Sequence, residues 1–563
     1  MSFSGTPSSV PQDYSLLAHY VGSYTELRHQ DIDRDVATTS EEVDVNEPLL
    51  YHRRPIPTIP VSRVSADQPS RLSETTPLLN PPVPRIREDV DALSHVSRNT
   101  VDVFWDEVKI LVRYSLPVFG THIFEHSMIM ASVISIGHLS TIDLAAATMG
   151  FMTANITGLS IIQGMANTLD TVLPSAWTSD QPKLVGLWTQ RMSILMSIML
   201  IPMLAIWFNA EPILLALRQE PEIARLAGLY LKWASLGLPA YAFNAISRRY
   251  FQAQGLFTVP TRIILCVAPL NIFLNYLLVW GPEPVRLGFI GAPIASSISY
   301  NLVSIASVIY GVFFVRKTAW HPITAKAFTD LGFITKLSIG GVGQVASSWW
   351  SWELVGIAAS FLGAVPLATQ SILISTTSSF FQAPYALGIA TSVRIGNLLG
   401  ERNAKRAGVA VRASCLLGVV LAVLFSSTLM TLRHSWGYLF NDDPEVVQLV
   451  AAVLPLVALV EIFDNGTALV GGILRASGKQ LLGATLNISA YYAIGFPIGF
   501  WLTFKWDMQL IGLWLGLNLA MAFSASIGLY ISLTTDWNRE VEKVMARLAA
   551  DKAYRPQDEE HRH

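Results

Sequence analysis

Long apolar runs separated by short polar segments limit this chain to few folds. A helix rises about 1.5 Å per residue, so each run is long enough to cross a hydrocarbon layer about 30 Å thick. A mean hydropathy of +0.42 with 14% charged residues is far from the balance of a soluble protein. We therefore expect an all-α integral membrane protein that contacts the lipid bilayer. The twelve predicted spans lie near 112–137, 145–173, 190–210, 223–245, 258–280, 288–315, 335–362, 366–393, 406–432, 446–472, 480–504 and 510–534.

The two ends of the chain differ from this apolar middle. Residues 1–105 are polar with scattered Pro and Ser and predict a disordered cytosolic tail without a secretory signal. Segments 74–79 and 46–50 resemble acidic dileucine sorting signals, although so short a pattern arises by chance about as often. The functional interpretation is delivery to a vacuolar or lysosome-like membrane, with the plasma membrane as the alternative. Within the C-terminal tail, 537–563, the stretch 537–554 has the spacing of a short amphipathic surface helix on the cytosolic side.

Charges in the loops predict the orientation. Loops after even-numbered runs are basic, whereas loops after odd-numbered runs are acidic or neutral. Cytosolic loops carry an excess of Lys and Arg, so the first set is predicted to be cytosolic, together with both termini. The basic residues are Lys183, Arg191, Arg248, Arg249, Arg316, Lys317, Lys326, Arg402, Lys405, Arg406, Arg475 and Lys479.

Signatures from the first half of the chain recur in the same order in the second. Gly164-Met-Ala166 corresponds to Gly388-Ile-Ala390, and Leu270-Asn271-Ile272 to Leu486-Asn487-Ile488. Such repeats are typical of transporters built from two related parts. We expect two six-helix lobes related by pseudo-two-fold symmetry about the membrane normal. The predicted boundaries are 106–316 for the N-lobe, 317–334 for a cytosolic inter-lobe loop and 335–536 for the C-lobe.

Several motifs together resemble the multidrug and toxic compound extrusion (MATE) family, in its eukaryotic, fungal-like branch. They cover about residues 110 to 535 and are Gly137-His138-Leu139, the stretch 163–171 (QGMANTLDT) with Gly186 and Gln190-Arg191, 349–353 (WWSWE), 394–400 (RIGNLLG) and 474–480 (LRASGKQ). The resemblance implies a secondary antiporter that exports organic cations or other xenobiotics from the cytosol in exchange for protons by alternating access. It also implies that Glu353 and Asp464 line a cavity of the C-lobe and couple cation to proton.

The acids themselves support part of this expectation. Glu353 is the single charged residue between 337 and 362, where an ionised carboxylate is costly unless it is paired, hydrated or protonated. A structural hydrogen bond between helices is the alternative. Asp464 and Glu461 are three residues apart, near one face of a helix, where two carboxyls can share a proton. For Glu461 we favour a hydrated acid near the outer mouth over a direct role.

Other polar and aromatic residues are weaker candidates. Trp349 and Trp350 could offer cation–π faces, although packing or interfacial roles are equally compatible with the sequence. Asp170 more plausibly closes an inner gate than touches substrate. Glu125 is an additional acid that could line the N-lobe cavity. The remaining cavity candidates are Gln344, Gln370 and Tyr492.

One motif suggests a different class of protein. His122, Glu125 and His126 match the H-x-x-E-H pattern of zinc peptidases, so a membrane hydrolase is an unfavoured alternative. A flippase or a metabolite transporter of a related superfamily is the other alternative. We expect no enzyme activity, no bound metal and no cofactor, with energy from a proton gradient and sodium as the alternative coupling ion. The net charge of −2 says nothing by itself about acidic partners, and we expect a monomer with no nucleic-acid partner.

Overall fold

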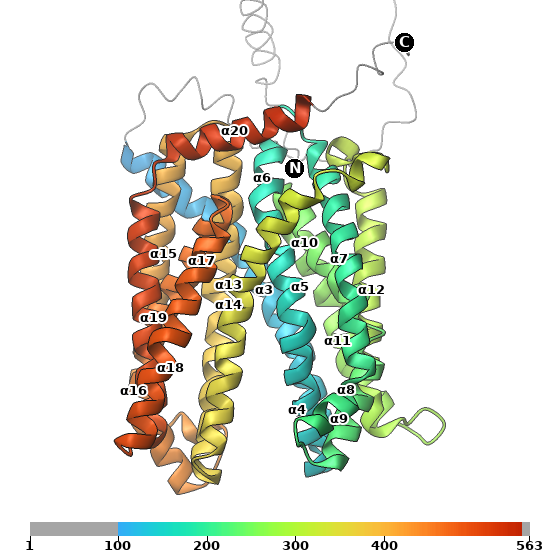
Figure 1. Cartoon of the computed structure of the whole chain (residues 1–563), viewed down its shortest axis with the longest axis vertical. Helices are drawn as coiled ribbons and strands as arrows, with labels where there is room; N and C mark the ends of the chain where they lie inside the picture. The colour runs from blue at the N-terminus through green and yellow to red at the C-terminus, as the bar shows by residue number, and fades with distance from the viewer. Residues whose placement is uncertain (1–99, 554–563) are drawn as a thin grey trace, which may run out of the picture. The chain divides into compact units, whose positions relative to one another are not determined.

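The structure, a computed structural model, describes residues 100–553, with side chains to residue 550 (Figure 1). Every regular element in this range is a helix. Both dileucine-like segments and nearly all of the predicted N-terminal tail lie outside the described residues.

We call α3–α12 the N-half and α13–α19 the C-half. The N-half contains α3 (Thr100–Gly137), α4 (Thr141–Ala154), the π-helical turn η1 (Asn155–Leu159), α5 (Ser160–Ala166), α6 (Leu169–Thr178), α7 (Leu184–Phe208), α8 (Ala210–Ala216), α9 (Pro221–Ala234), α10 (Leu238–Ala253), α11 (Thr258–Trp280), η2 (Gly288–Ile290) and α12 (Gly291–Phe313). Two short 3₁₀ turns follow, η3 (Lys317–Ala319) and η4 (Ala325–Phe328). The C-half and the terminal helix contain α13 (Leu331–Ser360), α14 (Ala364–Gly400), α15 (Ala404–Thr431), η5 (Gly437–Leu439), α16 (Pro444–Ala476), α17 (Gln480–Ile488), the π-helical turn η6 (Ser489–Gly495), α18 (Phe496–Phe500), the π-helical turn η7 (Trp501–Lys505), α19 (Gln509–Leu533) and α20 (Trp537–Ala553).

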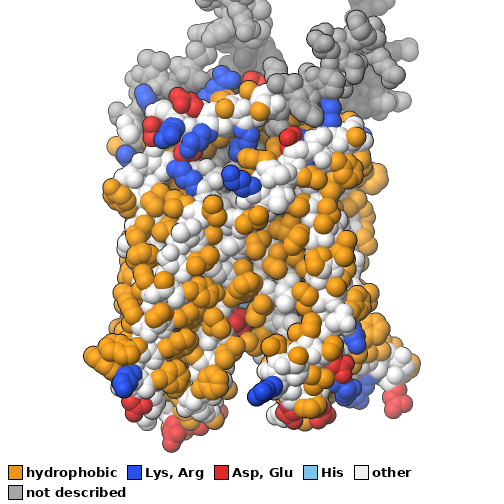
Figure 2. Space-filling view, in the orientation of Figure 1, with side chains coloured by type: hydrophobic (Ala, Val, Ile, Leu, Met, Phe, Trp, Pro, Cys, Tyr) orange, Lys and Arg blue, Asp and Glu red, His pale blue; other side chains and the backbone are white. Residues whose placement is uncertain are grey.

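The surface of the bundle suits a bilayer. Within the described residues, eight helical stretches are long and apolar enough to cross a membrane, by length and composition. Figure 2 shows hydrophobic side chains over the flanks of the molecule, with Lys, Arg, Asp and Glu gathered toward the two ends. Exposed side chains such as Ile201, Phe313 and Val423 belong to this apolar flank. A charged side chain is costly in hydrocarbon and an apolar one is not, so the protein is an integral membrane protein.

The predicted apolar runs lie in helices or in short turns between them, and several boundaries differ from the prediction. The run 145–173, for example, is interrupted between α5 and α6. α3 begins at Thr100, well before the predicted start near 112, because the acid Glu107 is fully buried against two arginines and does not end the helix. The predicted run 223–245 is divided into α9 and α10. Pro239 accounts for the break, since proline has no backbone N–H and is tolerated only in the first turn of a helix.

The two halves pack along α5–α13, α6–α14 and α3–α14. A Cβ at Gly341 of α13 would overlap the carbonyl oxygen of Gly164 on α5, so both positions require glycine for this approach. The largest apolar cluster combines residues of both halves, such as Leu173 of α6 and Leu399 of α14. A second cluster around Trp514 lies wholly within the C-half.

In Figure 1, α20 lies across the end of the bundle where α6, α14 and α15 meet. At the opposite end, Figure 2 shows a notch between the halves with acidic side-chain atoms at its apex.

Candidate functional site

Glu353 lies on α13 and is partly buried. Its Oε1 accepts a hydrogen bond of 3.4 Å from Nδ2 of Asn155, which begins the π-helical turn η1 in the N-half. A π turn widens the helix locally, and such turns are frequent at functional sites. Among the residues that the structure describes, Glu353 has no basic partner within 4 Å. The Glu353 side chain therefore lies between the two halves, and its hydrogen-bond partner is the neutral amide of Asn155.

Asp464 and Glu461 lie together on α16, as their spacing predicts. Asp464 is 7% exposed and its Oδ1 accepts a 3.2 Å bond from Thr467 Oγ1. Glu461 is 0% exposed, and neither carboxylate oxygen has a hydrogen-bond partner in the described part of the chain. The expectation that Glu461 is a hydrated acid near the outer mouth is therefore wrong, since three-residue spacing fixes the face of a helix and not the depth of a side chain.

The structure does not bring Glu353 and Asp464 into contact. They lie on different helices, and neither a hydrogen bond nor an ion pair joins them in the described chain. The two acids therefore occupy separate positions, Glu353 on α13 and Asp464 on α16.

Most of the predicted cavity residues have structural partners. Gln370 Oε1 accepts from Trp514 Nε1 at 2.8 Å, and Tyr492 donates to the Ser347 carbonyl at 3.2 Å. The Gln344 side chain is buried against the helix that contains Gly483. Trp349 is partly buried, whereas Trp350 is 37% exposed. Trp352, a further candidate for a cation–π face in the sequence, packs on Trp514 with ring centroids 5.9 Å apart.

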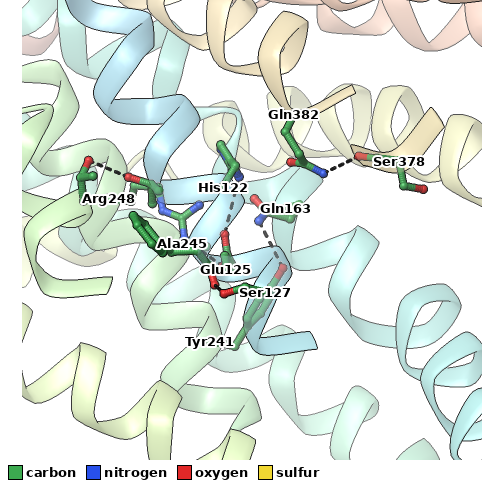
Figure 3. Close-up of polar contacts among 12 residues, drawn as sticks. His122, Glu125, Ser127, Gln163, Tyr241, Ala245, Arg248, Ser378 and Gln382 are labelled. Carbon is green, nitrogen blue, oxygen red and sulfur yellow. Dashed lines mark hydrogen bonds and ion pairs between the residues drawn. The ribbon is translucent and has the colours of Figure 1, made fainter. Parts of the chain in front are cut away.

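Glu125 is neutralised by an arginine in the N-half (Figure 3). Its Oε1 lies 3.0 Å from Nη2 of Arg248 on α10, and its Oε2 lies 3.6 Å from Nδ1 of His122. Sequence spacing predicts the His122 contact, one turn away on the same helix, but not the Arg248 contact, which joins positions 123 residues apart. The described residues contain no group of three His, Cys, Asp or Glu side chains placed to hold a metal ion.

Asp170 is also ion-paired. Its Oδ2 lies 3.4 Å from Nε of Arg475 on α16, and its Oδ1 lies 3.8 Å from Nε of Arg249 on α10. Arg249 in turn donates to the side chains of Gln163 and Asn167. The Asp170–Arg475 pair joins the N-half to the C-half, which is the geometry that a gate-closing role requires.

A third acid, Glu107, was missed by sequence reasoning. It is 0% exposed, and it accepts bonds from Arg394 of α14 at 2.7 Å and from Arg406 of α15 at 2.5 Å. The signal was present in the sequence, because an arginine inside an apolar run such as that around Arg394 needs a buried acid. This cluster fixes the start of α3 to the C-half.

The buried acids of the two halves therefore differ in their partners. In the N-half, Glu107, Glu125 and Asp170 each contact at least one arginine. In the described C-half, Glu353, Glu461 and Asp464 have no ion pair. An acid that is not neutralised inside an apolar bundle can take a proton or an organic cation, whereas a neutralised acid is already occupied.

A bundle of apolar helices that contains acids without an ion pair is typical of membrane transport proteins. Comparisons with known proteins identify the family. The model of the MatE family matches residues 117–277 and again residues 342–501, so the chain belongs to the MatE family of membrane transporters, which are not enzymes. The double match also confirms the internal duplication predicted from the repeated signatures.

Relatives and a solved structure agree with this assignment. The chain is 37% identical over 439 residues to an uncharacterized transporter of Schizosaccharomyces pombe, covering 78% of this chain and 81% of that protein. It is 32% identical over 443 residues to multidrug and toxin extrusion protein 2 of Mus musculus, covering 78% of this chain and 77% of that protein. The crystal structure of the eukaryotic MATE transporter AtDTX14 superposes with a TM-score of 0.75 at 28% identity, over 79% of this chain and 100% of that one.

Proposed function

We propose that this protein is an antiporter that exports organic cations and other xenobiotics from the cytosol in exchange for protons. The observation that carries the proposal is the contrast between the halves, namely neutralised acids in the N-half and unpaired acids in the C-half. The printed names of the mouse and other relatives refer to multidrug and toxin extrusion and support the choice of xenobiotic cargo.

The exchange is a competition for the same carboxylates. Glu353 and Asp464 are the principal groups, with Glu461 buried behind Asp464 on the same helix. A lipophilic cation and a proton each neutralise a carboxylate in a medium of low dielectric constant, and both together would leave an uncompensated positive charge. Proton entry from an acidic side therefore releases the cation, and proton loss to the cytosol restores the site.

Access to these groups alternates in the proposed mechanism. The twelve apolar runs form twelve spans in two six-helix lobes, 106–316 and 335–536, joined by the loop 317–334. The notch in Figure 2 opens at the end away from α20, while Asp170–Arg475 joins the halves near the other end. Rocking of the lobes would open each end in turn.

The proposal also covers the orientation of the protein, its membrane, its oligomeric state and the coupling ion. The α20 end and both termini lie in the cytosol in this proposal, which the basic loops support, and a vacuolar or lysosome-like membrane supplies the acidic side. The protein works as a monomer, and protons rather than sodium drive export. A flippase activity is less well supported, because unpaired acids in the C-half favour cationic cargo.

Transport in vesicles tests the function. Purified protein in liposomes with an acidic interior should accumulate a fluorescent organic cation, and a protonophore should abolish the accumulation. A matched set of vesicles carries a sodium gradient and no pH gradient. Accumulation driven by sodium alone, or insensitivity to the protonophore, would contradict proton coupling.

A further inference from the structure

The amphipathic helix α20 follows the last span and is fixed to the C-half. Trp537 is buried beside Gly408 of α15, and Glu540 pairs with Lys479 Nζ at 3.0 Å. Arg402, between α14 and α15, donates to Met545 Sδ at 3.2 Å. Only residues 534–536 separate α20 from α19, so the helix moves with the C-half.

The far part of α20 reaches the N-half. Arg547 Nη2 donates to Ser175 Oγ at 3.0 Å and to the Thr171 carbonyl at 3.4 Å, both on α6. Val544 and Leu548 are 6% and 7% exposed within the apolar cluster that the two halves share. α20 therefore has one set of contacts on each side of the α6–α14 boundary.

This boundary is closed beneath the helix. Thr178 Oγ1 donates to the Asn397 carbonyl at 2.7 Å, and Thr171 Oγ1 donates to the Arg475 carbonyl at 2.5 Å. The Thr178 bond joins α6 to α14 and the Thr171 bond joins α6 to α16. Separation of α6 from these two helices would break both bonds and those of Arg547, and would expose Val544 and Leu548. Exposure of buried apolar surface and loss of hydrogen bonds to a charged group both oppose that motion.

We propose that α20 is a strap that holds the α20 end of the transporter closed and thereby sets the balance between its two access states. The proposal rests on the alternating access of the proposed function. The strap has to release α6 in each transport cycle, and the hydrogen bonds of Arg547 to Thr171 and Ser175 break in that step. Shortening or loosening the strap should favour the state that is open at the α20 end.

A distance measurement tests the strap without reference to protons or cargo. Cys266 and Cys415 are free and are first replaced by Ser and Ala. Spin labels are then placed at Asp180→Cys, after α6, and Lys405→Cys, in α15; both positions are exposed. The Arg547→Ala variant should increase the population of the longer distance about fivefold or more. Arg539→Ala, an exposed arginine on the same helix, should leave the distribution unchanged.

A cross-link tests the strap in the functioning protein and detects variants that merely misfold. Ser175→Cys and Arg547→Cys are joined with a short reducible bis-maleimide in vesicles. Transport should fall to background after cross-linking and return on reduction, whereas the uncross-linked double variant should transport. An unchanged distance distribution in Arg547→Ala, or full transport while cross-linked, would overturn the strap. Failure of the proton-coupling experiment would leave the distance measurement interpretable, since that measurement uses neither protons nor cargo.

Discussion

Glu353 and Glu125 are both acids inside apolar helices, but their partners give them different roles. Glu353 contacts a neutral amide, whereas Glu125 contacts a guanidinium at 3.0 Å. Sequence alone predicts that both acids are intramembrane, and it cannot predict which of them is neutralised. That distinction depends on a residue on another helix far away in the sequence.

Replacing the unpaired acids should abolish coupling. Glu353→Gln and Asp464→Asn keep the shape of the side chain and remove its charge. We expect the initial rate of gradient-driven uptake in vesicles to fall about tenfold or more, since a charged interaction worth about 1.5–3 kcal/mol is lost. Glu445→Gln, an exposed acid at the start of the same helix as Asp464, serves as the control and should keep the rate. Normal uptake by Glu353→Gln would contradict its role.

The neutralised acid of the N-half should instead affect stability. Arg248→Met leaves Glu125 buried without its partner, which costs about 3–5 kcal/mol. The double variant Arg248→Met with Glu125→Gln removes both charges and should regain most of that loss. The midpoint of thermal unfolding in detergent reports the difference. Additive losses in the double variant would show that the two side chains do not act as a pair.

At the level of the helices, sequence reasoning succeeded where periodicity and composition decide the outcome. Most predicted apolar runs lie in one helical stretch, although 145–173 and 223–245 are interrupted, and the terminal amphipathic helix is present as α20. It failed where contacts between distant residues decide the outcome. Such contacts bury Glu107 and let α3 begin early. They also bury Glu461, and the spacing of residues in the sequence does not predict how deeply a side chain is buried. The contact of Asn155 with Glu353 was also missed, because a π turn has no signal in the sequence pattern.

The close approach of α5 and α13 gives a prediction with an internal control. Gly341→Ala would place a methyl group against the Gly164 carbonyl oxygen, whereas Gly356→Ala on the same helix has no neighbour within 4 Å. Alanine favours a helix over glycine by about 1 kcal/mol, so Gly356→Ala should be neutral or stabilising. Gly341→Ala should lower the unfolding temperature despite that gain. Equal unfolding temperatures for the two variants would show that the contact is loose.

At the level of the whole molecule, the charge bias of the loops predicts its orientation. Sealed vacuoles with their cytosolic face outward, carrying Lys405→Cys in a background without native cysteines, should react with a membrane-impermeant maleimide. Glu283→Cys, in the loop after α11, should react only after detergent is added. Mass shifts on a gel report the labelling. The reverse pattern would place the α20 end in the lumen and reverse the direction of transport.

The central claim is that cation and proton compete for unpaired acids of the C-half. It is tested most directly by adding tetraphenylphosphonium to the purified protein in weakly buffered detergent and recording the pH. We predict that the wild type and Glu445→Gln release protons as the cation binds, and that Glu353→Gln combined with Asp464→Asn releases markedly fewer. Equal proton release by the double variant would show that the exchange takes place elsewhere.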